Sequence, residues 1–199
     1  AMHLYTKNNK TPLPYRVHEE PSPEKLKEFA ETAKNFGFSI QTENYKVLSK
    51  SINEMVQKVE GTIEGDILQP LAIRSMEKAY YTSKKVGHFG LAFDYYAHFT
   101  SPIRRYPDLI THRMLYDYLT KSKSFNYNEV EKLAKHCSEQ EQKAVSAERA
   151  STKYKQVEYL SNFTNEEFEG IISGVTDWGI YVEIIENKCE GMVRIRDIK

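Results

Sequence analysis

The chain has 199 residues, 40% of them hydrophobic, and its 28 Lys and Arg residues balance its 28 Asp and Glu residues. A net charge of zero excludes attraction to a polyanion by overall charge, so any such affinity has to come from local clusters of basic side chains. No apolar run reaches the roughly 18 residues of a membrane-spanning helix, and two isolated cysteines, Cys137 and Cys189, indicate neither a disulfide framework nor a zinc ribbon. We therefore expect a cytoplasmic globular protein with no membrane partner, one substantial core and a small second module.

Helices are expected in the first part of the chain. A Pro-rich connector leads to Ser22, a hydroxyl residue typical of a helix N-cap, and Pro23 suits the first helical position because its missing N–H costs nothing there. The spacing of apolar residues predicts helices over about residues 24–36, 45–59 and 63–80, the first two ended by glycines and the third started or kinked by Pro70.

The middle of the chain changes character. The segments YYTSKK and FGLAFDYYAHF are rich in aromatic residues and favour strands. Helical periodicity then predicts a helix from Ser101 to about Leu119 and a long one over about residues 128–160. After the polar NFTNEE segment, glycine-punctuated strands follow. The predicted fold class is α+β, with a helix-rich first domain over residues 1–166 and a β module over residues 167–199.

The stretch HFTSPIRRYPDLITHR, residues 98–113, gathers basic side chains beside a predicted helix start. Ser101 and Pro102 signal that start, and the free N–H groups of a helix terminus suit a phosphate. The planar guanidinium of Arg104 can bind two phosphate oxygens at once, and further positive charge comes from Arg105, His98 and His112. The alternative is a purely structural one, in which Asp108 pairs with Arg104 or with Arg105 on a helix surface. The six histidines show no spacing typical of metal ligands, so we expect no metal site in this chain.

The long predicted helix carries a glutamate on its apolar side. Five residues fall on one stripe at 100° per residue, and Glu148 projects from the same face; they are Val130, Ala134, Cys137, Ala144 and Val145. A carboxylate on an inward face needs a partner, because desolvation of the lone charge is costly. Glu148 is therefore either an ion-pair partner of one of the arginines or a group that faces a substrate.

Several segments resemble one enzyme family. GHFGLAFDYYAHFTSPIRRYPDLITHRML is similar to the signature of the RNase II/RNase R (RNB) exoribonucleases, and most of all to the RNase R branch. LQPLAIRSMEKAYY and HCSEQEQKAVSAERA resemble the helices on either side of that signature. GIISGVTDWGIYVEI resembles the opening strands of an S1-type OB domain, of which residues 167–199 would be an incomplete antiparallel part.

The resemblance implies a function and its residues. The family hydrolyses RNA processively from the 3′ end to nucleoside 5′-monophosphates, using Mg²⁺ held by aspartates in the first half of the RNB domain. This sequence has no adjacent pair of aspartates, so we expect the C-terminal part of that domain, inactive by itself and without metal ligands. Arg104 aligns with the family's catalytic arginine, which contacts the scissile phosphate. By the same resemblance, Glu148 lies at the RNA-facing end of the channel, and the residues that position the single-stranded RNA backbone include Tyr96, His98, Thr100, Ser101 and Arg105.

The β module offers a second RNA surface. Trp178 and Tyr181 are expected to be exposed beside Lys188 and Arg194, as a platform on which single-stranded bases stack. Arg194 stands where S1-type domains usually carry a histidine, and the structural alternative for Trp178 is core packing. Two other functions stay open at this point: an autonomous single-stranded RNA-binding or adaptor module without nuclease activity, and a helical interaction scaffold. The sequence leaves the oligomeric state open.

Overall fold

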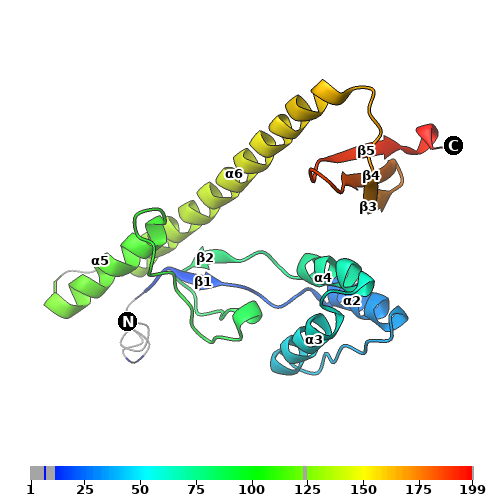
Figure 1. Ribbon diagram of the computed structural model, residues 1–199. Coiled ribbons are helices and arrows are strands. Elements are labelled where there is room, and N and C mark those ends of the chain that lie inside the picture. The colour runs from blue at the N-terminus through cyan, green and yellow to red at the C-terminus, as the bar shows by residue number, and fades with distance from the viewer. Residues whose placement is uncertain (1–6, 8–11, 123–124, 199) are drawn as a thin grey trace. The chain divides into compact units, whose positions relative to one another are not determined.

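The computed structural model describes residue 7, residues 12–122 and residues 125–198 (Figure 1). The fold is α+β, as expected. The elements in chain order are β1 (Tyr15–Val17), α2 (Pro23–Asn35), α3 (Tyr45–Val59), α4 (Ile63–Ser75), β2 (Tyr80–Thr82), α5 (Tyr106–Thr120), α6 (Tyr127–Leu160), β3 (Gly170–Thr176), β4 (Gly179–Ile184) and β5 (Glu190–Arg194). Within the described ranges, no helix is both long and apolar enough to cross a membrane.

Helices α2, α3 and α4 form one core. Each begins at a polar cap whose side chain accepts a hydrogen bond from a backbone N–H of the first turn: Ser22, Asn44 and Thr62. The cap at Ser22 and the first helical residue Pro23 confirm the sequence prediction. The helices bury an apolar cluster made of Phe29, Ala33, Leu48, Ile52, Met55, Val59, Leu68, Ala72 and Phe89.

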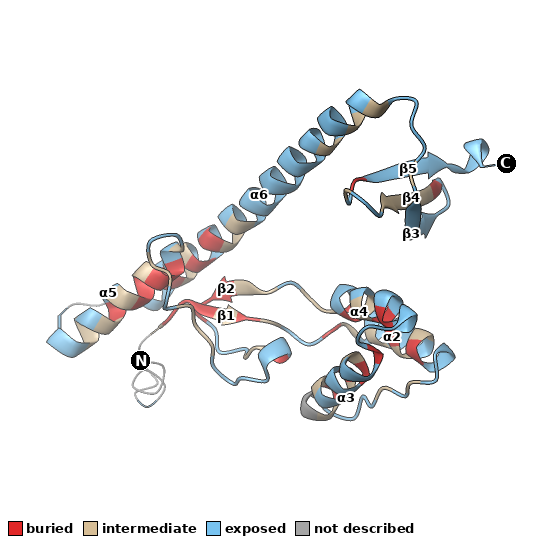
Figure 2. Cartoon of the chain, viewed as in Figure 1, coloured by how far each residue is buried: buried red, intermediate tan, exposed pale blue. Residues whose placement is uncertain are grey.

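A two-stranded ribbon and two helices form the second core. Strands β1 and β2 pair antiparallel, with Arg16 opposite Tyr81, although they are far apart in the sequence. Helix α5 and the first turns of α6 pack on this ribbon, as the buried colouring of Figure 2 shows. The buried residues of this cluster are Leu13, Tyr15, Val17, Tyr81, Ile110, Met114, Val130, Ala134 and Cys137.

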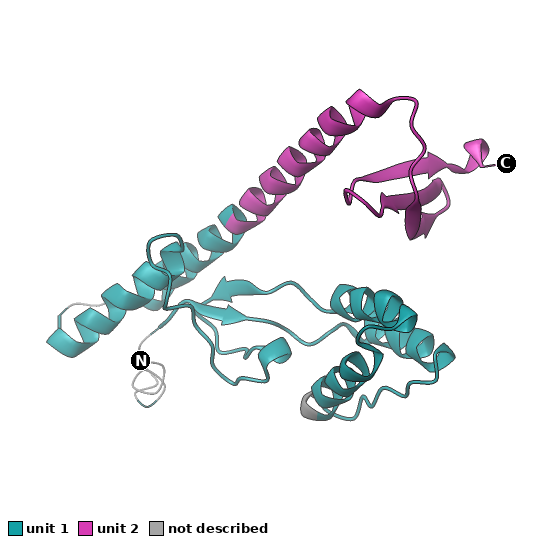
Figure 3. Ribbon diagram, viewed as in Figure 1, with its two compact units in different colours: residues 1–140 teal, residues 141–199 magenta. Residues whose placement is uncertain are grey.

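The chain divides into two compact units, residues 1–140 and 141–199, and the division falls within α6 (Figure 3). In the second unit, β3, β4 and β5 form an antiparallel sheet in that order, with a register irregularity between Ile172 and Gly174. The loop between β4 and β5 is tied to α6, because the Gln156 amide donates to the Lys188 carbonyl at 3.0 Å.

Four local predictions are corrected by the structure. Helix α5 begins at Tyr106 rather than after Ser101, because residues 101–105 close a separate turn. The segment FGLAFDYYAHF holds a short 3-10 helix and an isolated bridge between His88 and Phe93 instead of a long strand, because the N–H groups of residues 91–93 donate to carbonyls only three to five positions earlier. Trp178 lies in the tight turn between β3 and β4 rather than in a strand.

The fourth correction concerns the apolar stripe of α6. The stripe is buried only as far as Cys137, whereas Ala144, Val145 and Glu148 are exposed. The apolar cluster that covers Val130, Ala134 and Cys137 belongs to the unit of residues 1–140, and no buried residue of α6 follows Cys137. Helical periodicity identifies a face, but only the neighbouring elements decide how much of that face is buried.

Candidate nucleic-acid interface

The basic stretch forms a turn, which we call the arginine turn, residues 101–105, directly before α5. The backbone N–H groups of Arg104 and Arg105 both donate to the Ser101 carbonyl, at 3.2 and 3.0 Å. Arg105 is the N-cap residue of α5 but makes no side-chain capping bond. The Ser101 side chain is therefore not the helix cap that the sequence predicted. The turn instead projects the residues between Ser101 and the helix.

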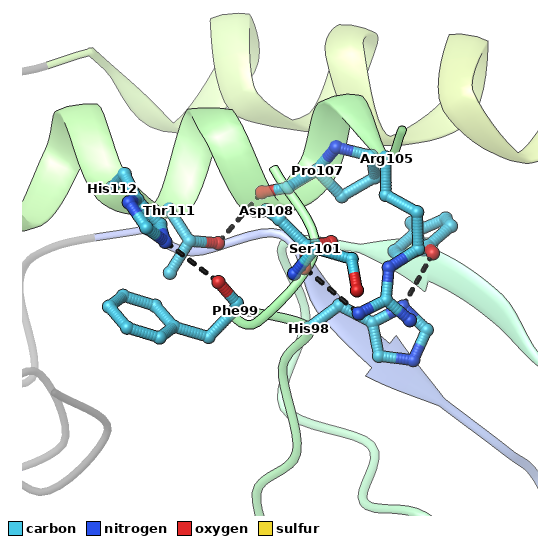
Figure 4. A network of polar contacts seen from close by, with 9 residues as sticks. His98, Phe99, Ser101, Arg105, Pro107, Asp108, Thr111 and His112 are labelled. Atoms are coloured by element: carbon cyan, nitrogen blue, oxygen red, sulfur yellow. Dashed lines mark hydrogen bonds and ion pairs between the residues drawn. The ribbon is translucent and has the colours of Figure 1, made fainter. Parts of the chain in front are cut away.

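A buried carboxylate holds this turn from within. Asp108 Oδ2 accepts a hydrogen bond from the Ser101 backbone N–H at 2.8 Å and an ion-paired one from Arg105 Nη2 at 2.9 Å. The Asp108 side chain is fully buried, and that of Arg105 is 24% exposed. A carboxylate removed from water requires such partners. Of the two pairings left open by the sequence, the structure contains the one with Arg105 (Figure 4).

A histidine holds the segment that enters the turn. His112 Nε2 lies 2.7 Å from the Phe99 carbonyl oxygen, which can only accept, so Nε2 carries the proton. The His112 and Phe99 rings stack with centroids 4.1 Å apart (Figure 4). Asp108 and His112 lie one helical turn apart on α5. Together they fix the backbone on which Arg104 stands.

Arg104 is the basic group of the turn that remains available. Its side chain is exposed and, among the described residues, makes no hydrogen bond or ion pair. Its neighbour Ile103 is 98% exposed, so the tip of the turn projects away from the core. A guanidinium on a fixed backbone with all its N–H donors unused can bind a phosphate through two oxygens.

Tyr96 and His98 belong to a column of rings rather than to an open surface. The Tyr81 hydroxyl lies 2.7 Å from His98 Nδ1. The Tyr96 ring stands edge-on to His98 at 5.5 Å and to His88 at 5.2 Å. Both residues are half-buried, whereas Thr100 is exposed. This packing positions Tyr96 and His98 beside the segment that leads into the arginine turn.

In the second unit, the residues predicted to bind RNA lie at two different ends of the sheet. Trp178 is 79% exposed, which excludes core packing within this unit, and its carbonyl accepts from the Ile195 N–H, next to Arg194. Tyr181 is half-buried in β4. Lys188 lies in the β4–β5 loop, where its amine pairs with Glu183 at 3.0 Å. Trp178 and Arg194 therefore share one end of the sheet, and Lys188 lies at the other. Glu148 is exposed on α6.

The part of the chain that the structure describes does not fit a Mg²⁺ site by itself. No three His, Cys, Asp or Glu side chains of the described residues come close enough to hold a metal ion. Mg²⁺ prefers carboxylate and other oxygen ligands, and the carboxylate of Asp108 is occupied by Ser101 and Arg105.

One polar cluster was missed by sequence reasoning. The carboxylate of Glu131 on α6 accepts hydrogen bonds from the Thr82 hydroxyl at 3.0 Å, from the Ser83 N–H at 2.6 Å and from the Ser83 hydroxyl. Burial acts to raise the pKa of Glu131, but the hydrogen bonds from Ser83 and Thr82 outweigh it and hold the pKa below its ordinary value. No local motif signals this contact, because its partners are almost fifty positions apart.

Comparison with known proteins identifies the relatives of both units. The family model of the RNB domain matches residues 1–121, and that of the S1 RNA binding domain matches residues 161–199, which confirms the resemblance seen in the sequence. Ribonuclease R 1 of Lactococcus lactis is 37% identical over 193 residues, covering 94% of this chain and 24% of the relative. Ribonuclease R of Aquifex aeolicus is 38% identical over 191 residues, covering 94% and 27%.

A solved structure gives the same result for the fold. RNase R of Mycoplasma genitalium, in complex with ribose methylated single-stranded RNA, superposes with a TM-score of 0.84 at 32% identity, covering 97% of this chain and 31% of that one. The chain spans about a quarter of the length of the curated relatives it matches.

Proposed function

This chain belongs to the RNB family, and on that basis we propose that it forms the phosphate-binding side of the active site in a 3′-to-5′ exoribonuclease of the RNase R type. The product class would be nucleoside 5′-monophosphates. The observation that carries the proposal is the unequal use of two adjacent arginines: Arg105 is held by buried Asp108, whereas Arg104 is exposed and unpaired among the described residues.

Arg104 has the chemistry that phosphodiester hydrolysis needs on the phosphate. Negative charge is spread over the non-bridging oxygens as the bond breaks, and a preorganised cation stabilises that charge without reorganising at the moment of reaction. The two anchors at Asp108 and His112 supply the preorganisation. Thr100 and Ser101 flank Arg104 and would position the RNA backbone.

The second unit would hold the strand through a separate set of contacts. Trp178 and Arg194 offer an exposed ring and a guanidinium at one end of the sheet, which suits base stacking with a phosphate contact. That RNase R of Mycoplasma genitalium binds ribose methylated single-stranded RNA supports the same class of ligand here. Tyr181, Lys188 and Glu148 remain further candidate contacts. We place the boundary between the two functional domains at residues 166/167, after the end of α6.

A second possible function is the binding of single-stranded RNA without its hydrolysis. In that case the chain is a single-stranded RNA-binding module, and the observation that favours it is that the described residues contain no group of three side chains able to hold a metal ion. The two functions differ in what Arg104 does. A binding module uses it for affinity alone, whereas an exonuclease needs its geometry for the rate.

The test is Arg104→Lys in the full-length protein that carries this sequence. Lysine keeps the charge but cannot bind two oxygens in one plane. We expect single-turnover cleavage to slow about 10²- to 10³-fold, with a much smaller loss of RNA affinity. Arg113→Lys on the exposed face of α5 is the matched control and should cleave normally. Normal cleavage by Arg104→Lys, or equal losses of affinity and rate, would reject the catalytic role of Arg104, whereas the absence of cleavage by the unmodified full-length protein would favour the binding module.

A further inference from the structure

A second concave site shares no lining residue with the arginine turn. It lies in the first unit, between the segment that follows β1 and the two segments that follow β2, and has a volume of about 510 Å³. This volume is in the range of small-molecule sites. Its walls come from residues 18–20, 85–89 and 93–95.

Two glycines, one in the wall of the cavity and one beside it, allow close packing of the backbone. Gly87 has a φ of +93°, and a Cβ there would lie 3.3 Å from the Phe93 carbonyl oxygen. A Cβ on Gly90 would lie 2.9 Å from His18 Nδ1, the atom to which the Gly90 N–H donates a hydrogen bond at 3.1 Å. Because Nδ1 accepts, the neutral His18 ring carries its proton on Nε2. The described residues give that Nε2–H no acceptor, and His18 is one of the residues that line the cavity.

Aromatic rings form most of the apolar wall. Phe89 is buried and stands edge-on to His18, whereas the Phe93 and Tyr95 rings are 54% and 44% exposed. Exposed aromatic faces beside a cavity are suited to stacking on a flat ring. Burial, together with His18 and Arg16, lowers the pKa of His88 to about 4, so the His88 ring is uncharged at neutral pH.

The charges at the rim disfavour a phosphate. Three carboxylates, on Glu19, Glu20 and Asp94, line the cavity against one amine, and that amine, on Lys85, lies over the Tyr95 ring at 5.6 Å. Carboxylates accept hydrogen bonds from ring N–H and amino groups, and they repel anions. The ligand that fits is therefore a flat ring with both donors and acceptors and without a negative charge of its own.

We propose that this cavity binds a nucleobase of the RNA strand whose phosphates Arg104 contacts. The ring would stack on Phe93, accept from His18 Nε2–H and donate to a rim carboxylate. A series of ring contacts links the cavity to the strand: His88, which lines the cavity, packs on Tyr96, Tyr96 packs on His98, and His98 precedes the arginine turn. This inference rests on the proposed function for its choice of RNA as the source of the base.

The experiment titrates the chain with adenosine and follows the side-chain resonances of His18 and His88 by NMR. We expect both to shift, with adenosine 5′-monophosphate binding more weakly and ribose 5-phosphate leaving them unchanged. Phe93→Ala should weaken adenosine binding about tenfold, the loss of one stacking contact. Leu91→Ala, an exposed residue of the same segment outside the cavity, is the matched control and should bind as the wild type does.

The outcomes separate the cavity from the proposed function. Adenosine that shifts neither histidine, ribose 5-phosphate that binds as well as adenosine, or displacement of adenosine by spermidine would overturn the base site, the last in favour of an organic cation. Binding of single-stranded RNA by the same preparation is measured in parallel. RNA binding without adenosine binding rejects the cavity alone, whereas adenosine binding with an Arg104→Lys enzyme that cleaves normally rejects the catalytic arginine and leaves the cavity in place.

Discussion

At the level of single residues, Asp108 Oδ2 accepts two hydrogen bonds, one from the Ser101 amide and one from the Arg105 guanidinium. The other oxygen, Oδ1, and Arg105 Nε are buried and have no hydrogen-bond partner among the described residues. The pair is thus joined through one oxygen only. A buried ion pair of this kind adds little net stability by itself, but removal of one member leaves an uncompensated charge.

This imbalance gives a stability prediction. We expect Asp108→Ala to lower the free energy of unfolding by about 3 kcal/mol, because Arg105 and the Ser101 N–H both lose their acceptor. Arg104→Ala should change it by less than about 0.5 kcal/mol, since its side chain is exposed. Urea unfolding of both variants measures the difference. Equal losses would mean that Arg104, and not Arg105, is the structural arginine.

The sequence alone does not determine which arginine pairs with Asp108. From spacing alone, Asp108 can pair with Arg104 or with Arg105, because both distances, i+4 and i+3, bring side chains together on a helix. That rule assumes that the helix already includes the arginines. Helix α5 begins only at Tyr106, so the conformation of the turn decides the pairing, and no helical periodicity describes the turn.

At the level of elements, local signals located the helices well. Caps such as Ser22 and stops such as Gly37 act through nearby backbone groups, so the sequence around them is sufficient. Strands depend on distant partners. The short strand β1 was predicted only as an extended connector, because its partner β2 lies beyond three helices. For the same reason, the Glu131 contact with the end of β2 had no local signature.

The contact of Glu131 with Thr82 and Ser83 predicts that the free energy of unfolding depends on pH. The pKa of Glu131 in the folded chain lies below its ordinary value, so its contribution is present above the unfolded pKa of about 4.3 and is lost as the pH falls through the folded value. We expect Glu131→Gln to cost about 1 kcal/mol at pH 7 and progressively less toward pH 3. Urea unfolding at pH 7, 5, 4 and 3 measures this difference in the free energy of unfolding.

The control is Glu139→Gln, on an exposed face of the same helix, which should cost nothing at any of these pH values. A loss that does not vary with pH would assign the effect to shape instead of charge.

At the level of the whole molecule, the family was predictable because a long signature lies in consecutive residues, from Gly87 through the arginine turn into α5. The two units could not be predicted in the same way. Their division at residues 140/141 falls inside a continuous helix, so no turn or linker marks it in the sequence. Exposure of the α6 stripe beyond Cys137 likewise depends on which elements cover the helix, and the sequence of the helix does not contain that information.

The last prediction concerns the purified 199-residue chain. Mg²⁺-dependent hydrolysis needs metal ligands, usually several carboxylates, close to the reacting phosphate. The sequence has no adjacent aspartates, and the described residues contain no group of three possible metal ligands. We therefore expect no release of mononucleotides from a 3′-tailed single-stranded RNA, with or without Mg²⁺, while the same preparation binds that RNA with an affinity that falls as salt rises. Arg104→Gln should weaken the binding and reduce the slope of log affinity against log salt by about one phosphate contact. Mononucleotide release that survives repurification and stops with EDTA would show that this chain assembles a metal site after all.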